Sequence, residues 1–194
     1  MNRNRLLEIP RVKFDAKVVN ENSEYGMLLD IGCYDKLLKK YLKDIRYVGI
    51  DYPEYDMEKN RLKFNNGTFD YVCCFEMLEH LIDQTNCIKE IKRVVKDDGL
   101  IFISLPNIEH IFVRIRVLFG FGIEIPYIVS KKTKHYHWGN FTQNKEFIRK
   151  HFKIVKMYHY GDFHRNTKLI KPSFLANLLP NLFAYRTIFI CKVK

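Results

Sequence analysis

Residues 27–51, MLLDIGCYDKLLKKYLKDIRYVGID, decide the fold. An apolar run ends at Gly32, a stretch with helical spacing of apolar residues follows, and a second apolar run ends at Asp51. Short apolar runs bounded by turn residues are typical of buried strands. The stretch therefore predicts a strand, a short helical connection and a second strand of a parallel sheet.

The same alternation continues along the chain. Residues 69–75 and 100–105 predict two further buried strands, and residues 87–95 between them predict an amphipathic helix. Residues 152–158 and 186–193 predict two more strands. The segment between Tyr52 and Gly67 is too short for a long helix plus a strand, so this crossover is expected to be abbreviated.

Size and composition indicate one domain of an ordinary globular protein. The chain has 194 residues, of which 47% are hydrophobic, and no apolar run reaches the 18 residues typical of a membrane-spanning helix. Residues 1–14 lack the pattern of a secretory signal. The cysteines are odd in number and have no C-x-x-C spacing, so we expect reduced, buried thiols in a cytoplasmic protein: Cys33, Cys73, Cys74, Cys87 and Cys191.

Charge is unevenly distributed along the chain. Residues 1–110 hold 17 Lys and Arg against 19 Asp and Glu, whereas residues 111–194 hold 16 against only Glu124, Glu146 and Asp162. An AT-rich genome would account for abundant lysine but not for this scarcity of acids. The second half therefore predicts a surface for an anionic partner, such as a phosphate, a nucleic acid or an acidic membrane.

Potential ligand-binding residues follow two consecutive predicted strands. Asp30, Gly32 and Cys33 come at the end of the first strand, and Asp51 ends the second. Ligands of open parallel sheets bind beyond the carboxyl ends of the strands, and glycine lets the backbone come close to a ligand. A carboxylate at the second position can accept both hydroxyls of a ribose. The arrangement predicts a site for a nucleoside cofactor.

Four motifs in register give the chain a family resemblance. LLDIGC (28–33), VGID (48–51), FDYVCCFEMLEHL (69–81) and IKEIKRVVKDDGLIFISLPN (88–107) resemble the class I S-adenosylmethionine-dependent methyltransferases, and in particular the small type 11 proteins. The resemblance implies an α/β, Rossmann-like three-layer sandwich with a seven-stranded, mostly parallel sheet whose last strand is antiparallel. It also implies a methyltransferase domain over residues 27–194, in which residues 108–141 are a substrate lid or an insertion. The polar residues before it predict an N-terminal arm over 1–26.

The resemblance further implies S-adenosylmethionine as the cofactor. Asp51 would hold the ribose hydroxyls, Asp56 would meet the adenine amino group, and Met57 would pack near the adenine ring. The implied cofactor-binding residues are Asp30, Gly32, Cys33, Asp51, Tyr52, Asp56, Met57, Phe75 and Glu76.

The candidate catalytic residues are histidines that could take a proton from a hydroxyl acceptor. His80 and His137 are the main candidates, with His135 beside them and His110 as a further one. The alternatives are a structural role for His80 at a helix start and a packed aromatic loop around His135 and His137. No metal site is predicted.

The first loop departs from the family pattern. The family usually has glycines at the positions of Tyr34 and Lys36. We expect Tyr34 to be tolerated if its backbone stays at negative φ. The substitution leaves open a non-catalytic, cofactor-binding regulatory protein.

The predicted activity is methyl transfer to a small-molecule or glycan- or lipid-linked acceptor, at oxygen. An RNA methyltransferase is the alternative enzyme. The expected partner is an anionic acceptor, with nucleic acid ranked lower. Residues 108–130 are the candidate for peripheral membrane contact; within them Ile111, Ile115 and Leu118 have helical spacing, for which core packing is the default explanation.

Overall fold

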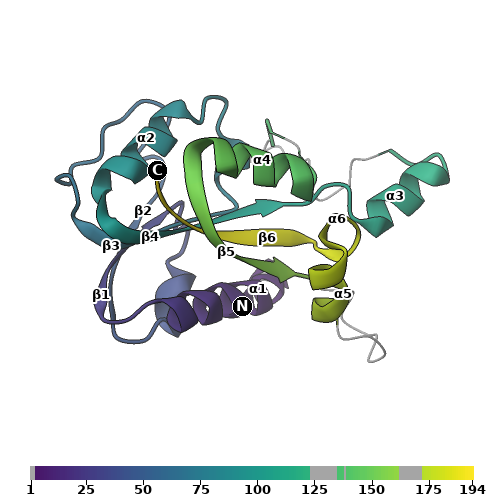
Figure 1. Ribbon diagram of the computed structural model, residues 1–194, viewed down its shortest axis with the longest axis horizontal. Helices are drawn as coiled ribbons and strands as arrows, with labels where there is room; N and C mark the ends of the chain where they lie inside the picture. Colours follow the sequence, from purple (N-terminus) through teal and green to yellow (C-terminus); the bar gives the residue numbers. More distant parts are fainter. Residues whose placement is uncertain (1–2, 123–134, 138, 162–171) are drawn as a thin grey trace.

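The computed structural model describes residues 3–122, 135–137, 139–161 and 172–194 (Figure 1). Within these ranges one sheet has the strand order β2-β1-β3-β4-β6-β5. Its strands are β1 (Gly26–Ile31), β2 (Ile45–Ile50), β3 (Phe69–Phe75), β4 (Val95–Pro106), β5 (Phe152–Tyr160) and β6 (Arg186–Val193). Strands β1 to β4 run parallel to one another, and β6 is antiparallel to both β4 and β5.

The predicted fold class and the antiparallel last strand are confirmed, but the prediction of seven strands is wrong for the described residues, which form a six-stranded sheet. The cause lies between β2 and β3, where residues 51–68 form turns instead of a helix and an edge strand. These turns are anchored on helix α2 (Thr85–Val94). Arg93 of α2 donates to the carbonyls of Leu62 and Phe64, and Glu90 accepts from the Leu62 amide at 2.8 Å.

Helices cover both faces of the sheet. On one face, α2 and α4 (Phe141–His151) bury Ile91 and Ile148 against the strands. On the other face, α1 (Arg3–Asn22), in the region expected as an N-terminal arm, buries Ala16, Val18 and Val19. Figure 1 shows α1 on the side of the sheet opposite α2 and α4. Because the helices cover the two faces of the sheet, the site residues lie at the ends of the strands.

The remaining helices are short. They are the 3-10 helices η1 (Leu37–Tyr41) and η2 (Leu78–His80), and the α-helices α3 (Ile111–Leu118), α5 (Pro172–Leu178) and α6 (Pro180–Phe183). All five cysteines are buried and free of disulfides, as expected. Among the described residues, no helix is long and apolar enough to cross a membrane.

Helix α3 projects from the body of the molecule (Figure 1). Val113 is buried, whereas Ile115 and Leu118 are 43% and 79% exposed. Core packing therefore does not explain the apolar spacing predicted for this helix. Within the predicted lid, residues 123–134 and 138 lie outside the described residues.

A buried ion pair joins α1 to β6. The guanidinium of Arg186 is fully buried and bonds to the carboxylate of Asp15. It also donates to the hydroxyl of Ser104 on β4 at 3.3 Å and lies 5.2 Å from the ring centre of Tyr160. One cation thus holds the first helix and three strands together at the carboxyl edge of the sheet.

Asp15→Ala should lower the free energy of unfolding by about 3 kcal/mol, because it leaves the Arg186 charge buried without its counter-ion. Urea denaturation followed by circular dichroism measures the change. Lys17→Ala, which breaks the exposed pair of Lys17 with Glu21, is the control and should cost less than about 1 kcal/mol. Equal effects in the two variants would show that the buried pair does not organise the fold.

Candidate functional site

The first loop begins where β1 ends and is fixed to β2. The amides of Gly32 and Cys33 both donate to the carbonyl of Ile50, at 2.9 and 3.2 Å. Gly32 has a φ of 77°, and a side-chain Cβ there would lie 2.8 Å from Cγ of Met77. Glycine is therefore required here both by backbone conformation and by space.

The loop keeps a left-handed backbone at two further positions. Tyr34 has a φ of 47° and Lys36 a φ of 58°. The condition of a negative φ, under which Tyr34 is expected to be tolerated, is therefore not met. The loop therefore has the backbone shape that glycines at these positions would allow. Because Tyr34 and Lys36 have side chains, their left-handed backbone is strained, at a cost of roughly 1–2 kcal/mol per residue.

Asp51 holds this loop in place from the end of β2. Its two carboxylate oxygens accept from the amide of Tyr34 at 2.6 Å and from the amide of Tyr52 at 2.8 Å. The two tyrosine side chains are exposed on the surface beside it. Each carboxylate oxygen can accept more than one hydrogen bond, so Asp51 retains the capacity to bind hydroxyl groups.

Asp30, by contrast, is buried below the loop. The hydroxyl of Tyr47 donates to its carboxylate at 2.7 Å. Burial raises the pKa of Asp30 to about 7, against the lowering effect of the Tyr47 hydrogen bond. Burial, with a contribution from Asp30, also raises the pKa of the Cys33 thiol to about 11. Cys33 is thus a neutral packing residue at physiological pH.

Asp56 and Met57 lie in the turns after β2. Asp56 accepts from the amide of Glu58 at 3.0 Å, and its carboxylate is 3.6 Å from the Lys59 ammonium. Met57 is buried in the core on the α2 side of the sheet. The predicted contacts of these two residues with adenine stay predictions.

A second group of residues follows β3, which lies next to β1 in the sheet. Glu76 has a φ of 50°, and its amide and carboxylate both bond to the Ser104 hydroxyl, at 3.0 and 2.9 Å. Phe75, before it, is half-buried and packs on the α1 side. Residues held in sparsely populated backbone regions cluster at functional sites.

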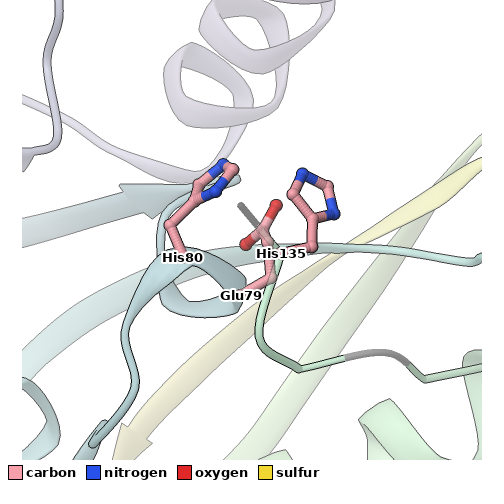
Figure 2. A group of neighbouring side chains, drawn as sticks. All are labelled: Glu79, His80 and His135. Atoms are coloured by element: carbon pink, nitrogen blue, oxygen red, sulfur yellow. The ribbon is translucent and has the colours of Figure 1, made fainter. Parts of the chain in front are cut away.

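Glu79, His80 and His135 come together just beyond Glu76. Figure 2 shows the Glu79 carboxylate between the two imidazole rings, whose centres are 4.5 Å apart. Burial raises the pKa of Glu79 well above its usual range, with a further contribution from the charge of Glu76. Burial lowers the pKa of His135, so its imidazole is neutral at physiological pH.

Backbone contacts place His135 in this cluster. The amides of Tyr136 and His137 donate to the Glu79 carbonyl at 2.8 and 3.3 Å. The His137 ring lies 3.1 Å, through Nε2, from the Ile82 carbonyl. The segment 135–137 is therefore tied to the chain that follows β3.

The predicted site residues thus form two groups. One lies at the ends of β1 and β2, and the other, with Phe75, Glu76, His80, His135 and His137, lies after β3. Sequence reasoning missed Glu79 as a site residue, although it stands directly beside His80 in the LEHL segment. It also missed Tyr47, for which the local sequence offers no signal.

A basic hollow of about 530 Å3 lies elsewhere, between α4 and β5, with Lys145, Arg149, Lys153, Lys156 and Lys194 in its lining. The start of β5 pairs with the end of β6, beside the start of the β4 ladder. The hollow is therefore near the amino ends of the parallel strands, at the edge opposite the two groups of site residues.

The layers, the strand order and the strand-end site define a Rossmann-like α/β protein of the methyltransferase class. A family model described as a methyltransferase domain matches residues 4–164. This match covers most of the chain, which therefore belongs to that family. The predictions of a class I methyltransferase family, of a methyltransferase enzyme and of S-adenosylmethionine as the family's cofactor are confirmed.

Individual relatives match shorter stretches. A ubiquinone biosynthesis O-methyltransferase of Colwellia psychrerythraea is 45% identical over 60 residues, 31% of this chain and 24% of the relative. An uncharacterized protein of Methanocaldococcus jannaschii is 26% identical over 99 residues, 45% of this chain and 44% of the relative. These alignments therefore span about a quarter to under a half of the curated relatives' length.

A solved structure has the same fold over the whole chain. A SAM-dependent methyltransferase from Archaeoglobus fulgidus superimposes with a TM-score of 0.62 at 16% identity, covering 98% of this chain and 100% of that chain.

The residues at the ends of β1 and β2 fit an adenosyl cofactor. Gly32 leaves room where any side chain would collide with Met77. Asp51 presents a partly exposed carboxylate at the strand end, and Tyr34 and Lys36 preserve the left-handed course of the loop. The substitutions at 34 and 36 therefore change the loop's side chains but not its backbone shape.

Asp30→Asn should make the protein more stable at high pH. The folded-state pKa of Asp30, about 7, lies above its ordinary value of 3.8, so stability is lost as the pH rises from about 4 to about 7. A tenfold change in proton affinity is worth about 1.4 kcal/mol. The variant's advantage in urea denaturation should therefore grow by about 2.5 kcal/mol between pH 5 and pH 8. Tyr47→Phe removes the hydrogen bond that lowers the pKa of Asp30, so the loss of stability with rising pH should be larger than in the wild type. A stability difference between Asp30→Asn and the wild type that does not depend on pH would contradict the raised pKa of Asp30.

Lys36→Gly should raise the free energy of unfolding by about 0.5–1 kcal/mol. Glycine relieves the left-handed strain at this position, and the gain is partly offset by glycine's greater freedom in the unfolded chain. Thermal or urea denaturation tests this. Lys39→Gly, in the adjacent helix η1, is the matched control and should destabilise.

Proposed function

We propose that this protein is an S-adenosylmethionine-dependent O-methyltransferase that acts on a small-molecule or a glycan- or lipid-linked acceptor. The observation that carries the proposal is the meeting of two groups at one edge of the sheet. A loop and carboxylate suited to a nucleoside lie at the ends of β1 and β2. A carboxylate and imidazole cluster lies after the neighbouring strand β3.

The proposed division of labour follows from this arrangement. When bound, the cofactor supplies a methyl group activated by a positively charged sulfur. Gly32 and Asp51 bind and orient the adenosyl part, which lowers the entropic cost of alignment. In this arrangement the acceptor hydroxyl lies near His80 and His135 and gives its proton to the His135 imidazole. The neutral imidazole of His135 can act as this base, because a protonated imidazole could not receive a proton.

Oxygen as the accepting atom is supported by the relatives. Proteins named ubiquinone biosynthesis O-methyltransferase match this chain at 38–45% identity over about 60 residues. A hydroxyl acceptor also suits the histidine cluster, since a hydroxyl must lose a proton on methylation.

A lipid-linked or membrane-bound acceptor is supported by helix α3. Its projecting end exposes apolar side chains beside two arginines, Arg114 and Arg116. The apolar residues are Phe112, Ile115, Val117, Leu118, Phe119 and Phe121. Apolar and basic side chains together are suited to the interface of an anionic membrane.

RNA is the alternative acceptor, and the basic hollow between α4 and β5 supports it. Its position at the opposite edge of the sheet makes it less suited to presenting a base to the site. A non-catalytic cofactor-binding protein is the other alternative, which the non-glycine residues at 34 and 36 keep open.

Titration calorimetry with S-adenosylhomocysteine tests the cofactor site. Asp51→Ala should weaken binding at least about 10-fold, because charge-assisted hydrogen bonds to the ribose are worth more than about 1.4 kcal/mol. Asp98→Ala, which removes an exposed carboxylate near the start of β4, should bind as tightly as the wild type. NAD should not bind.

Transfer of a labelled methyl group then separates the remaining alternatives. Label appearing in hydroxyl-bearing small molecules or lipids supports the proposal. Binding without any transfer would favour the non-catalytic alternative, and preferential transfer to RNA would replace the acceptor. Unchanged affinity in Asp51→Ala would overturn the site itself.

A further inference from the structure

The cluster after β3 has the composition of a metal centre. One oxygen of Glu79 and one ring nitrogen each of His80 and His135 lie within 4.8 Å of one another. Figure 2 shows the three side chains side by side, with the Glu79 carboxylate between the two rings and the residues coming from two separate segments of the chain. Glu79 and His80 belong to η2, and His135 is placed by the backbone contacts described above.

The buried carboxylate supplies an independent observation. Glu79 is only 2% exposed, and its Oε2 atom has no hydrogen-bond partner among the described residues. A buried polar oxygen without a partner costs about 1–3 kcal/mol, and more when it is charged. The Glu79 carboxylate lies beside the two imidazoles, where a bound cation would satisfy it.

The donor set indicates which kind of ion fits. Two imidazole nitrogens and one carboxylate oxygen are typical ligands of divalent zinc, iron, cobalt or manganese. Magnesium and calcium prefer oxygen ligands alone. Three protein ligands also leave coordination positions open, which is typical of catalytic rather than structural metal sites.

We propose that Glu79, His80 and His135 bind one divalent transition-metal ion at the acceptor end of the site. This inference rests on the proposed function for its role and departs from the sequence-based expectation of no metal. The ion would take the oxygen of the acceptor hydroxyl at an open position and lower the pKa of that hydroxyl. The proton would then leave to water instead of to His135, whose ring nitrogen would be a ligand. Glu76, whose charge acts on both Glu79 and His135, adds negative charge that favours a cation here.

Cobalt binding by the full chain, without a histidine tag and after treatment with a chelator, is the test. Calorimetry with Co2+ should give one ion per chain. The visible spectrum should show cobalt d–d bands without a sulfur-to-cobalt band, since the ligands are nitrogen and oxygen. Mg2+ should bind more weakly than Co2+.

Two variants and a control assign the ligands. Glu79→Gln keeps the side chain's shape and should weaken Co2+ binding at least about 10-fold, as should His135→Ala. His151→Ala removes an imidazole at the end of α4, away from the cluster, and should leave Co2+ affinity and spectrum unchanged. Circular dichroism confirms that each variant is folded, and a poorly folded Glu79→Gln leaves His135→Ala to decide.

The outcomes distinguish this proposal from the proposed function. Binding of S-adenosylhomocysteine without a Co2+ site would overturn the metal centre and leave the cofactor site standing. A Co2+ site lost in the two variants, without cofactor binding, would support the metal centre and overturn the methyltransferase proposal. Co2+ bound equally by the variants and the control, or weaker than Mg2+, would also overturn the metal centre.

Discussion

The buried charge of Arg186 is the constraint on which the site edge of this protein depends. A guanidinium without exposure is costly unless a counter-charge and hydrogen-bond acceptors surround it. Asp15 on α1 supplies the counter-charge, the Arg11 carbonyl accepts a hydrogen bond, and Ser104 on β4 accepts another. The same Ser104 hydroxyl donates to Glu76. A chain of polar contacts therefore runs from the first helix, through the last strand and Ser104, to Glu76 at the start of the group of site residues after β3.

Strain is concentrated along the same edge. Tyr34, Lys36 and Glu76 all hold left-handed backbone conformations that glycine adopts without cost. The contacts that hold them are specific: the Asp51 carboxylate binds the Tyr34 amide, and Ser104 binds the Glu76 amide. The protein thus spends part of its stability on the shape of its strand-end loops.

The two groups of site residues each contain a carboxylate, in different surroundings. Asp51 is partly exposed in the group at the ends of β1 and β2, whereas Glu79 is buried beside two imidazoles in the group after β3. A cationic methyl donor suits the first environment, and a metal ion with a hydroxyl ligand suits the second. The basic surface of α4 and β5 lies at the opposite edge of the sheet and is free to serve a different, anionic contact.

The sequence by itself predicted most of the strands, the layers and the positions of Gly32 and Asp51 at two strand ends, because these depend on local periodicity and on residues directly following strands. LLDIGC and VGID place Gly32 and Asp51 at the ends of two consecutive strands, and the strand order of the sheet puts those two ends side by side. Tertiary structure alone decided the sheet's six strands, the left-handed φ of Tyr34, and the meeting of Glu79 with His135. It also joined Arg186 to Asp15, which are 171 positions apart. Such contacts depend on how distant segments pack, and no local pattern of residues encodes that packing.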